Sequence, residues 1–471
     1  MSILIKGGRV ITAADDYVGD VYVEGERISL IGESLDVQAE KTIDASGKYV
    51  LPGCVDPHTH LDMPFGGTVT IDDVESGQTA AAFGGTTCHV DFIIQPQGQT
   101  FAAAFDEWRS KANGKQVIDM GYHMAVTDLK QGGTLEELAS LPEQGITSYK
   151  LFMAYKGALM VDDETLFRTM QVAAETGALV MVHAENGDAI DVLVKEALAE
   201  GKTEPKYHAL TRPPETEGEA TNRAIQLARV AGCPLYVVHV SCRESVEPIA
   251  LARDKGWDVW GETCTQYFFI DYDYLEMPNF EGAKYVYTPP PRDKPNQEVL
   301  WNAVRTDVLS AISTDHCAFL WDGQKTLGRD DFSKIPNGGP GIENRLQMIH
   351  EFGVRTGRIS LNRMIELLAT NPAKLFGLYP RKGTIAVGSD ADLVVFDPDR
   401  EVTITAAAHH SKVDYNLFEG TRVTGSPELV LLRGHVLVEN DELVAAPGIG
   451  QFLHRARFGE ELKPARLAAA G

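Results

Sequence analysis

Two histidines near the start of the chain have a spacing that suits a metal site. His58 and His60 stand two residues apart, at the end of a short apolar run that begins near Cys54. In a strand, residues two apart point to the same face, so both imidazoles can reach one ion. The pair alone is weak evidence, because two structural histidines would explain it equally well.

Three further side chains strengthen the metal interpretation. His183 and His239 each follow a short apolar run, and Asp315 follows another. Imidazole and carboxylate groups are ligands of zinc and related divalent ions. Each of these residues alone could be a hydrogen-bonded core residue. Four histidines and an aspartate at corresponding strand ends favour a metal site instead.

Lys150 lies in another apolar run, where a bare ammonium group is costly to bury. Two divalent ions close together repel each other, so a site for two ions needs a bridging anion. A lysine carbamylated by carbon dioxide would be such an anion. The chemistry of the residues alone supports equally a lysine that extends its amine to solvent or pairs with an acid.

The elements that would position these residues alternate between strand and helix. Short apolar runs recur eight times between about residues 52 and 379, and stretches rich in Ala, Glu and Leu separate most of them. This pattern predicts an α/β fold with a TIM-like (β/α)8 barrel, whose active sites lie at the carboxyl ends of the strands. An open doubly wound sheet is the competing fold, but it usually carries a Gly-rich loop where this chain has His58 and His60. The predicted strands are 54–56, 87–94, 120–126, 148–154, 179–183, 235–240, 259–262 and 309–314, and the clearest predicted helices are 163–176, 188–200, 217–231 and 244–255.

Both ends of the chain have a different pattern, in which short apolar runs predict strands without helices between them. Residues 3–5, 9–12, 20–23 and 28–31 predict short strands, and Gly7-Gly8 predicts a break between the first two. Similar runs return within 383–397 and 429–438. We therefore expect residues 1–52 and 379–471 to build one small β-sandwich domain, with a C-terminal tail at its end, around a barrel formed by residues 53–378. The tail after about residue 455 is either an assembly arm or disordered, and the Ala-rich end at 467–471 is expected to fray.

The composition excludes several classes of partner. The chain of 471 residues has 43 Lys and Arg against 67 Asp and Glu, a formal charge of −24. Such an acidic excess argues against nucleic acid or an anionic membrane as a partner. The sequence has no apolar run long enough to span a membrane, and its N-terminus lacks the apolar core of a signal peptide. Six cysteines without a CxxC pair indicate a reducing compartment, so we expect a cytoplasmic protein.

Longer segments of the chain resemble a known family. The metal-site residues, Tyr155, and the segments from Tyr285 to Arg292, Phe332 to Arg345 and Arg381 to Asp392 resemble the dihydropyrimidinase and D-hydantoinase family of the amidohydrolase superfamily. The resemblance extends from about residue 7 to residue 420. It implies a hydrolase that acts on carbon–nitrogen bonds in cyclic amides, and a homotetramer.

The resemblance also implies the ligands and the reaction. Two Zn²⁺ ions per subunit would be bridged by carbamylated Lys150, with His58, His60 and Asp315 on one ion and His183 and His239 on the other. Another divalent ion could replace zinc. Water activated between the ions would attack the ring amide of a 5-substituted hydantoin or a dihydropyrimidine and yield an N-carbamoyl amino acid. Tyr155 would stabilise the oxyanion, and Asp315 would carry a proton from the water to the leaving nitrogen.

The remaining implied residues bind the substrate, a small cyclic ureide. The backbone near Thr288 and Asn337 would hold the ureide edge of the ring, although the family commonly has Ser in place of Thr288. Met63, Phe65, Phe152 and Leu159 would form an apolar wall around the exocyclic substituent. Asp56 and Ser241, which neighbour the predicted ligands, could support them from behind.

Three alternative functions fit the residues less well. Dihydroorotases place a carboxylate-binding arginine just after the His-x-His pair, where this chain has Leu61 and Asp62. Allantoinase fits the loop sequences less well. A non-catalytic tetrameric scaffold, similar to the collapsin-response mediator proteins, would have lost metal ligands, whereas every expected ligand position is filled here.

Overall fold

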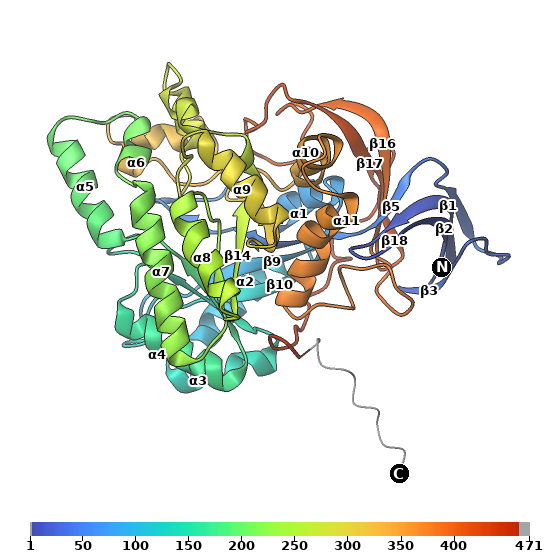
Figure 1. Ribbon diagram of the computed structural model, residues 1–471, viewed down its shortest axis with the longest axis horizontal. Coiled ribbons are helices and arrows are strands. Elements are labelled where there is room, and N and C mark those ends of the chain that lie inside the picture. The colour runs from blue at the N-terminus through green and yellow to red at the C-terminus, as the bar shows by residue number, and fades with distance from the viewer. Residues whose placement is uncertain (1, 461–471) are drawn as a thin grey trace, which may run out of the picture.

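The computed structural model describes residues 2–460, and eight parallel strands of these residues form a barrel (Figure 1). Each strand pairs with the next along the chain, and a backbone hydrogen bond of 2.8 Å from His60 N to His316 O joins the last strand's end to the first. The barrel strands are β6 (Cys54–Thr59), β9 (Thr86–Ile94), β10 (Asp119–Ala125), β11 (Ser148–Phe152), β12 (Leu179–His183), β13 (Leu235–Val237), β14 (Val259–Cys264) and β15 (Ala311–Ser313). All eight predicted barrel strands are present.

Helices cover the outside of the barrel, and in Figure 1 α4 to α9 form its green and yellow flank. The α-helices are α1 (Val74–Phe83), α2 (Phe101–Ala112), α3 (Leu135–Ser140), α4 (Asp163–Thr176), α5 (Gly187–Ala199), α6 (Lys206–Leu210), α7 (Pro214–Ala231), α8 (Arg243–Asp254), α9 (Pro295–Arg305), α10 (Arg345–Ile349), α11 (Leu361–Ile365) and α12 (Asn371–Leu375). Short 3-10 helices are η1 (Leu141–Gln144), η2 (Thr265–Phe268), η3 (Tyr272–Glu276), η4 (Glu281–Tyr285), η5 (Lys325–Gly328) and η6 (Phe332–Lys334), and η7 (His350–Arg355) and η8 (Glu366–Thr370) are π-helical.

Helix α4 shows why the helical predictions hold. The Asp162 carboxylate accepts a hydrogen bond from the backbone N–H of Thr165, which caps the first turn. Gly177 follows the last turn in the left-handed conformation, φ 72°, where a glycine ends a helix at little cost. The helix therefore begins and ends at the predicted residues, 163 and 176.

The two chain ends form one nine-stranded sheet beside the barrel, where blue β1 to β3 and orange β16 and β17 lie together in Figure 1. Its strands are β1 (Ser2–Ile11), β2 (Asp16–Glu24), β3 (Arg27–Gly32), β4 (Lys41–Asp44), β5 (Tyr49–Pro52), β16 (Leu393–Thr403), β17 (Arg422–Leu432), β18 (His435–Glu439) and β19 (Glu442–Leu443), and β7 (Pro64–Phe65) with β8 (Thr68–Val69) is a separate hairpin. The predicted assembly of one β-rich unit from both ends is confirmed. The domain boundaries at 52/53 and 378/379 stay predictions.

The predicted break at Gly7-Gly8 was wrong, because β1 continues through it. The register between β1 and β2 shifts between Ile5 and Gly8, which marks a β-bulge. Gly7 adopts φ 68° there, and its N–H donates to the Asp20 carboxylate at 2.8 Å. A glycine bulge therefore bends one strand where the sequence suggested a turn between two.

The C-terminal tail packs under the barrel as far as the structure describes it. Residue Phe452 bridges to Met120, and the buried Arg455 guanidinium donates to Ser148 Oγ at 2.9 Å. Phe458 N donates to Gly177 O at 3.0 Å. Residues 467–471, which we predicted to fray, lie outside the described residues.

Candidate metal centre

The carboxyl ends of the barrel strands gather the predicted site residues around one cavity of about 40 Å³. Strands β6, β11 and β12 carry His58, Lys150 and His183 directly. All thirteen predicted site residues line this cavity: His58, His60, Met63, Phe65, Lys150, Phe152, Tyr155, Leu159, His183, His239, Thr288, Asp315 and Asn337. Cys317 and Gly338, which sequence reasoning did not single out, complete the lining.

His58, His60 and Asp315 form a compact group that could hold a divalent ion. One carboxylate oxygen of Asp315 lies 3.1 Å from Nε2 of each histidine, and the potential ligand atoms all lie within 4.8 Å of one another. Burial opposes ionisation of Asp315, but the two histidines hold the pKa of its carboxyl well below its usual range. Burial lowers the pKa of His60 to about 4, so its imidazole is neutral, as a ligand must be.

His183 and His239 lie beside this group. The ring centroids of His183 and His239 are 4.5 Å apart, and those of His58 and His239 are 5.5 Å apart. Burial lowers the pKa of His239 far below its usual range, which again leaves a neutral imidazole. The four rings therefore surround a common space.

The Lys150 amine is one of several buried polar groups at the centre that have no hydrogen-bond partner among the described residues. Its side chain is fully buried, and Nζ has no hydrogen-bond partner among the described residues. The Phe92 and Phe152 rings lie 5.0 and 5.1 Å from Nζ, and burial lowers the pKa of the amine to about 7. Buried polar groups almost always have a hydrogen-bond partner, so this amine is unusual.

Carboxylates that the sequence analysis missed support two of the histidines. His58 Nδ1 donates to Glu262 at 2.5 Å, and the Tyr236 hydroxyl donates to the other oxygen of Glu262 at 2.9 Å. His183 Nε2 donates to Glu185 at 2.7 Å. Such carboxylates fix which ring nitrogen remains free for a metal. The available signal was a glutamate at the end of a predicted barrel strand in one case, and two residues after a predicted ligand in the other.

Asp56, which the sequence analysis suggested as a support, is buried next to the end of β15. Its carboxylate accepts from Thr314 Oγ1 at 2.6 Å and lies 3.7 Å from the buried Arg345 guanidinium. Arg345 also donates to Val55 O and Ile312 O, at 3.1 and 2.9 Å. This network closes the barrel between β6 and β15 and fixes the position of Asp315.

Ser241 is part of a second buried network. Its hydroxyl donates to Glu217 at 2.5 Å and accepts from Arg292 Nε at 2.9 Å, and the same Glu217 oxygen pairs with Arg292 at 2.8 Å. Ser241 stands two residues after His239. The network therefore supports the loop that carries His239.

Three residues at the cavity have a left-handed backbone. Tyr155, His239 and Asp315 have φ of 67°, 41° and 48°. Residues other than glycine pay a steric cost in this region, and such strain concentrates at functional sites. It also explains why β13 and β15 end at residues 237 and 313, whereas the apolar pattern predicted strands to 240 and 314.

The polar side of the cavity is formed by Tyr155, Thr288 and Asn337. Tyr155 is half-buried, and burial raises the pKa of its hydroxyl, which therefore stays protonated and able to donate. The Thr288 hydroxyl lies 3.1 Å from Nε2 of the buried His208. The same His208 nitrogen lies 3.0 Å from Tyr287 O, so His208 contacts both the Thr288 side chain and the backbone just before it.

The apolar side is formed by Met63, Phe65, Phe152 and Leu159. The Phe65 ring meets the Tyr155 ring edge to face, with centroids 5.2 Å apart, and the Phe152 and Tyr155 rings are 6.0 Å apart. Phe65 lies in the β7–β8 hairpin, and Leu159 N donates to Tyr155 O at 3.1 Å. Phe65, Phe152 and Leu159 therefore all contact Tyr155, the residue that carries the hydroxyl on the polar side.

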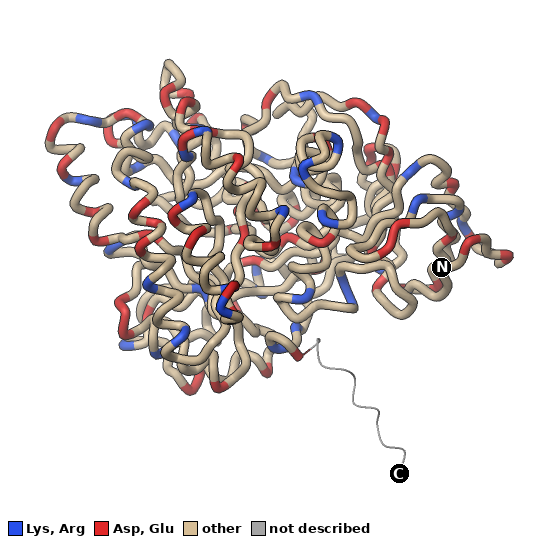
Figure 2. The backbone as a smooth tube through the Cα atoms, in the orientation of Figure 1, with Lys and Arg blue, Asp and Glu red and all other residues tan. Residues whose placement is uncertain are grey.

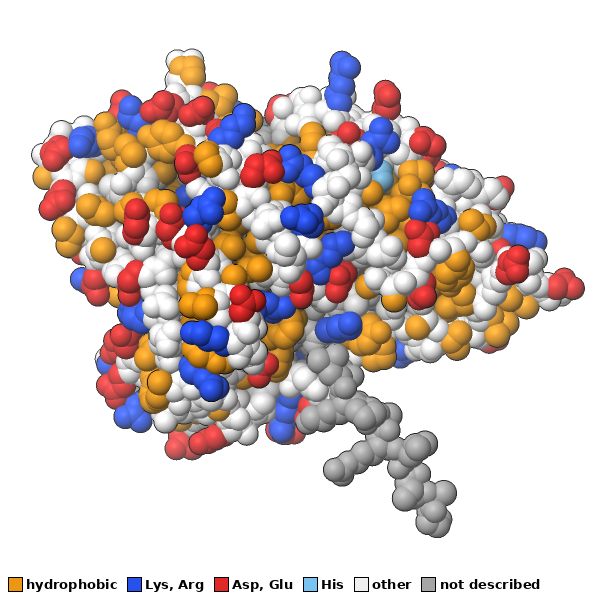
Figure 3. Space-filling model, in the orientation of Figure 1, with side chains coloured by type: hydrophobic (Ala, Val, Ile, Leu, Met, Phe, Trp, Pro, Cys, Tyr) orange, Lys and Arg blue, Asp and Glu red, His pale blue; other side chains and the backbone are white. Residues whose placement is uncertain are grey.

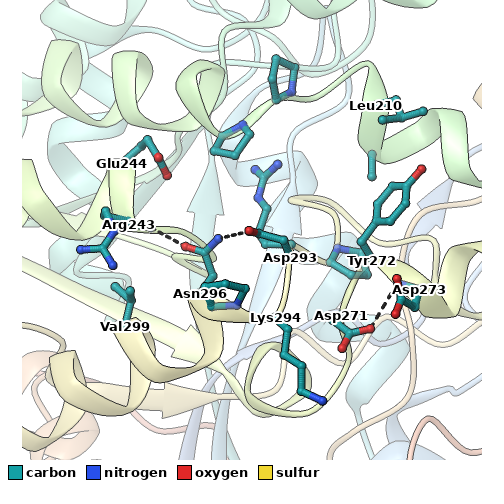
Figure 4. A pocket seen from close by; sticks show the side chains of 16 residues that line it. Leu210, Arg243, Glu244, Asp271, Tyr272, Asp273, Asp293, Lys294, Asn296 and Val299 are labelled. Atoms are coloured by element: carbon teal, nitrogen blue, oxygen red, sulfur yellow. Dashed lines mark hydrogen bonds between the residues drawn. The ribbon is translucent and has the colours of Figure 1, made fainter.

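A larger cavity of about 540 Å³ lies elsewhere and contains none of the predicted site residues (Figure 4). Asp271, Asp273 and Asp293 face it together with Arg243 and Lys294. Asn296 is held between Arg243 N and Asp293, at 2.9 and 2.5 Å. Its charges are mixed and it contains none of the predicted ligands, so the smaller cavity is the candidate site.

The charged surface agrees with the acidic composition. Acidic and basic residues are intermixed along the outer helices (Figure 2), and on the face in Figure 3 acidic side chains are spread widely while several basic ones lie close together near its centre. No helix of residues 2–460 is long and apolar enough to cross a membrane.

The fold and the site together define a class of protein. The family described as "Amidohydrolase family" matches residues 49–437, most of the chain, so this protein is an amidohydrolase. The family is metal-dependent, which agrees with the cluster of His58, His60 and Asp315.

Individual relatives show to which family of amidohydrolases the chain belongs. A D-hydantoinase of Geobacillus stearothermophilus is 56% identical over 460 residues, which cover 98% of each chain. A crystal structure of dihydropyrimidinase from Brevibacillus agri superposes with a TM-score of 0.96 at 55% identity, covering 97% of this chain and 99% of that one. A D-hydantoinase of Streptomyces coelicolor is 52% identical over 458 residues, covering 96% of this chain and 98% of its own. The chain belongs to the dihydropyrimidinase and D-hydantoinase family of amidohydrolases.

Proposed function

We propose that this protein hydrolyses the ring amide of 5-substituted hydantoins or dihydropyrimidines and releases an N-carbamoyl amino acid. The observation that carries the proposal is the buried Lys150 amine, which has no hydrogen-bond partner among the described residues and faces the histidine cluster. A scaffold that had lost its chemistry would not need such a costly group. The names of the relatives support the substrate class.

The donor set fits two divalent ions. His58, His60 and Asp315 would hold one, His183 and His239 the other, and carbamylated Lys150 would bind both. The geometry that supports this is the pair of 3.1 Å distances around Asp315 and the close packing of the four rings. When bound, the ions would supply Lewis acidity that lowers the pKa of water and polarises the ring carbonyl. We propose zinc, because imidazole and carboxylate ligands suit it.

The protein's own groups then carry out three tasks. Asp315 accepts the proton that the attacking water loses and returns it to the ring nitrogen as the carbon–nitrogen bond breaks. The Tyr155 hydroxyl donates to the oxygen on which charge develops. The backbone at Thr288 and Asn337 orients the ureide edge. Water oxygen thus becomes part of a carboxylate, and the ring nitrogen leaves as an amide of the carbamoyl group.

The apolar wall determines which exocyclic substituents of the substrate are favoured. Phe65 and Leu159 offer hydrocarbon surface, so apolar or small substituents are favoured over charged ones. This agrees with the absence of an arginine at positions 61 and 62, where dihydroorotases bind a carboxylate. The resemblance also predicts a homotetramer in the cytoplasm, and both stay predictions.

A panel of four cyclic substrates tests the proposal. Metal-loaded protein is assayed with dihydrouracil, 5-phenylhydantoin, dihydroorotate and allantoin, and the products are identified by mass spectrometry. We expect N-carbamoyl products from the first two and rates at least about 100-fold lower for the charged dihydroorotate. Preference for dihydroorotate or allantoin would reassign the substrate, and turnover of none of the four would reject the function.

A further inference from the structure

A second buried lysine lies beside the cavity without lining it. Lys325, at the start of η5, has a fully buried side chain. Its Nζ donates to three backbone carbonyls: Val286 O at 2.7 Å, Pro336 O at 2.7 Å and Gly338 O at 2.6 Å. The three N–H groups of one ammonium are thus fully used.

These carbonyls belong to the two backbone segments that form the polar side of the cavity. Val286 stands two residues before Thr288, and Pro336 and Gly338 flank Asn337. Gly338 N also donates to Val286 O at 3.0 Å, which joins the segments directly. The amine of Lys325 therefore lies at the junction of the two segments.

The junction is tightly packed. Gly338 has φ 144°, and a Cβ there would lie 2.3 Å from Cys317 O. The Cys317 thiol contacts Asn337 O at 3.7 Å. The backbone at Asn337 and Gly338 therefore packs closely against Cys317, and the Lys325 bonds join this packed segment to Val286.

Joining the two segments through a buried lysine costs free energy. None of the ion pairs among residues 2–460 includes it, and burial lowers the pKa of its amine to about 7. A buried cation without a carboxylate partner costs free energy that an apolar residue would avoid. A role in function accounts for keeping it.

We infer that Lys325 is a positioning residue for substrate binding, which fixes the separation of the backbone segments at Thr288 and Asn337. The inference rests on the proposed function, in which these segments hold the ureide edge. A ureide presents N–H and C=O groups at a fixed spacing, so the protein groups that pair with it must keep a fixed spacing as well. Lys325 does not line the cavity and touches no reacting atom.

The test compares Lys325→Met with Lys334→Met. Methionine keeps the length of the side chain but has no donor. Lys334 lies nearby in η6, its side chain is 70% exposed, and it makes only an ion pair to Asp331 at 3.4 Å, so it is the matched control. For both variants, KM and kcat are measured with dihydrouracil and 5-phenylhydantoin, together with bound metal and secondary structure by circular dichroism.

We expect Lys325→Met to raise KM about tenfold or more for both substrates, because hydrogen bonds to the ring edge are misplaced. The value of kcat should fall less than KM rises, metal content should be unchanged, and Lys334→Met should match wild type. Equal KM values in Lys325→Met and wild type would overturn the inference. So would a fall in kcat together with loss of metal.

Two further outcomes, a variant that does not fold and an inactive wild-type protein, are distinguished as follows. If Lys325→Met does not fold, Lys325→Gln, whose amide can donate two hydrogen bonds, replaces it and should give an intermediate KM. If neither variant folds, the lysine stabilises the fold and the inference is overturned. Wild-type protein that hydrolyses no cyclic ureide would reject the proposed function itself, which the wild-type assay reveals before any variant is compared.

Discussion

The Nδ1 atom of His58 lies 2.5 Å from Oε1 of Glu262, and both side chains are buried. Because a carboxylate accepts, His58 donates through Nδ1, so Nε2 is the nitrogen that a metal would bind. Nε2 is the atom that lies 3.1 Å from Asp315. One glutamate on β14 therefore orients a predicted metal ligand on β6.

This relationship predicts the effect of Glu262→Gln. The glutamine keeps the volume but removes the charge, so His58 becomes a poorer and less well oriented ligand. We expect metal affinity to fall about 10- to 100-fold, measured by competition with a chelator. Glu247→Gln, at a side chain that is 67% exposed, should bind metal as wild type does. Unchanged affinity in Glu262→Gln would show that Glu262 does not orient His58.

Removal of the Tyr155 hydroxyl tests the oxyanion assignment. Tyr155→Phe keeps the ring contacts with Phe65 and loses only the donor. We expect kcat to fall about 100- to 1000-fold with little change in KM, because the bond strengthens only as charge develops. Steady-state kinetics with dihydrouracil measure both values. A rise in KM at constant kcat would instead assign the hydroxyl to substrate binding.

Substitution of Gln324 should change the selectivity of the enzyme for substrates with an exocyclic substituent. Its amide donates to Thr68 Oγ1 and Val69 O, both at 2.8 Å, and so fixes the hairpin that carries Phe65. In Gln324→Ala the apolar wall should loosen. We expect KM for 5-phenylhydantoin to rise about fivefold, within the range that a contact in an apolar pocket contributes, and KM for unsubstituted dihydrouracil to change little. Equal changes for both substrates would contradict this role.

The sequence predicted much of the barrel and its site, because both depend on local patterns. Apolar runs marked all eight strands, and His58 and Asp315 stand at strand ends that converge in this fold. Glu262 and Lys325 were not found, because their roles depend on particular contacts, with His58 and with backbone carbonyls, that a pattern of apolar runs does not show. Left-handed residues such as His239 also shortened strands in a way that hydropathy does not reveal.

A buried charge cluster joins the barrel to the terminal sheet. Lys382 Nζ lies 2.6 Å from Asp119, 2.9 Å from Asp390 and 2.8 Å from Asp392, and all four side chains are buried. Lys382→Met leaves these carboxylates without their lysine. We expect a loss of about 3–5 kcal/mol in the free energy of unfolding, measured by denaturant titration. A loss below about 1 kcal/mol would contradict this role of the cluster.

Lys202→Met is the control for that titration. Its side chain is 43% exposed, and its ion pair is with Glu200. Exposed pairs contribute little to stability, so the control should unfold within about 0.5 kcal/mol of wild type.

The most direct test of the bridged metal centre compares wild type with Lys150→Ala after metal loading in bicarbonate buffer. Bound metal is counted, and hydrolysis of dihydrouracil and 5-phenylhydantoin is measured, with Lys195→Ala, at a 72% exposed side chain, as the control. We predict about two ions per chain and ring opening in wild type and control, and loss of the bridged pair and of turnover in Lys150→Ala. Retention of both ions and of wild-type turnover in Lys150→Ala would contradict the bridging role of Lys150 and the function built on it.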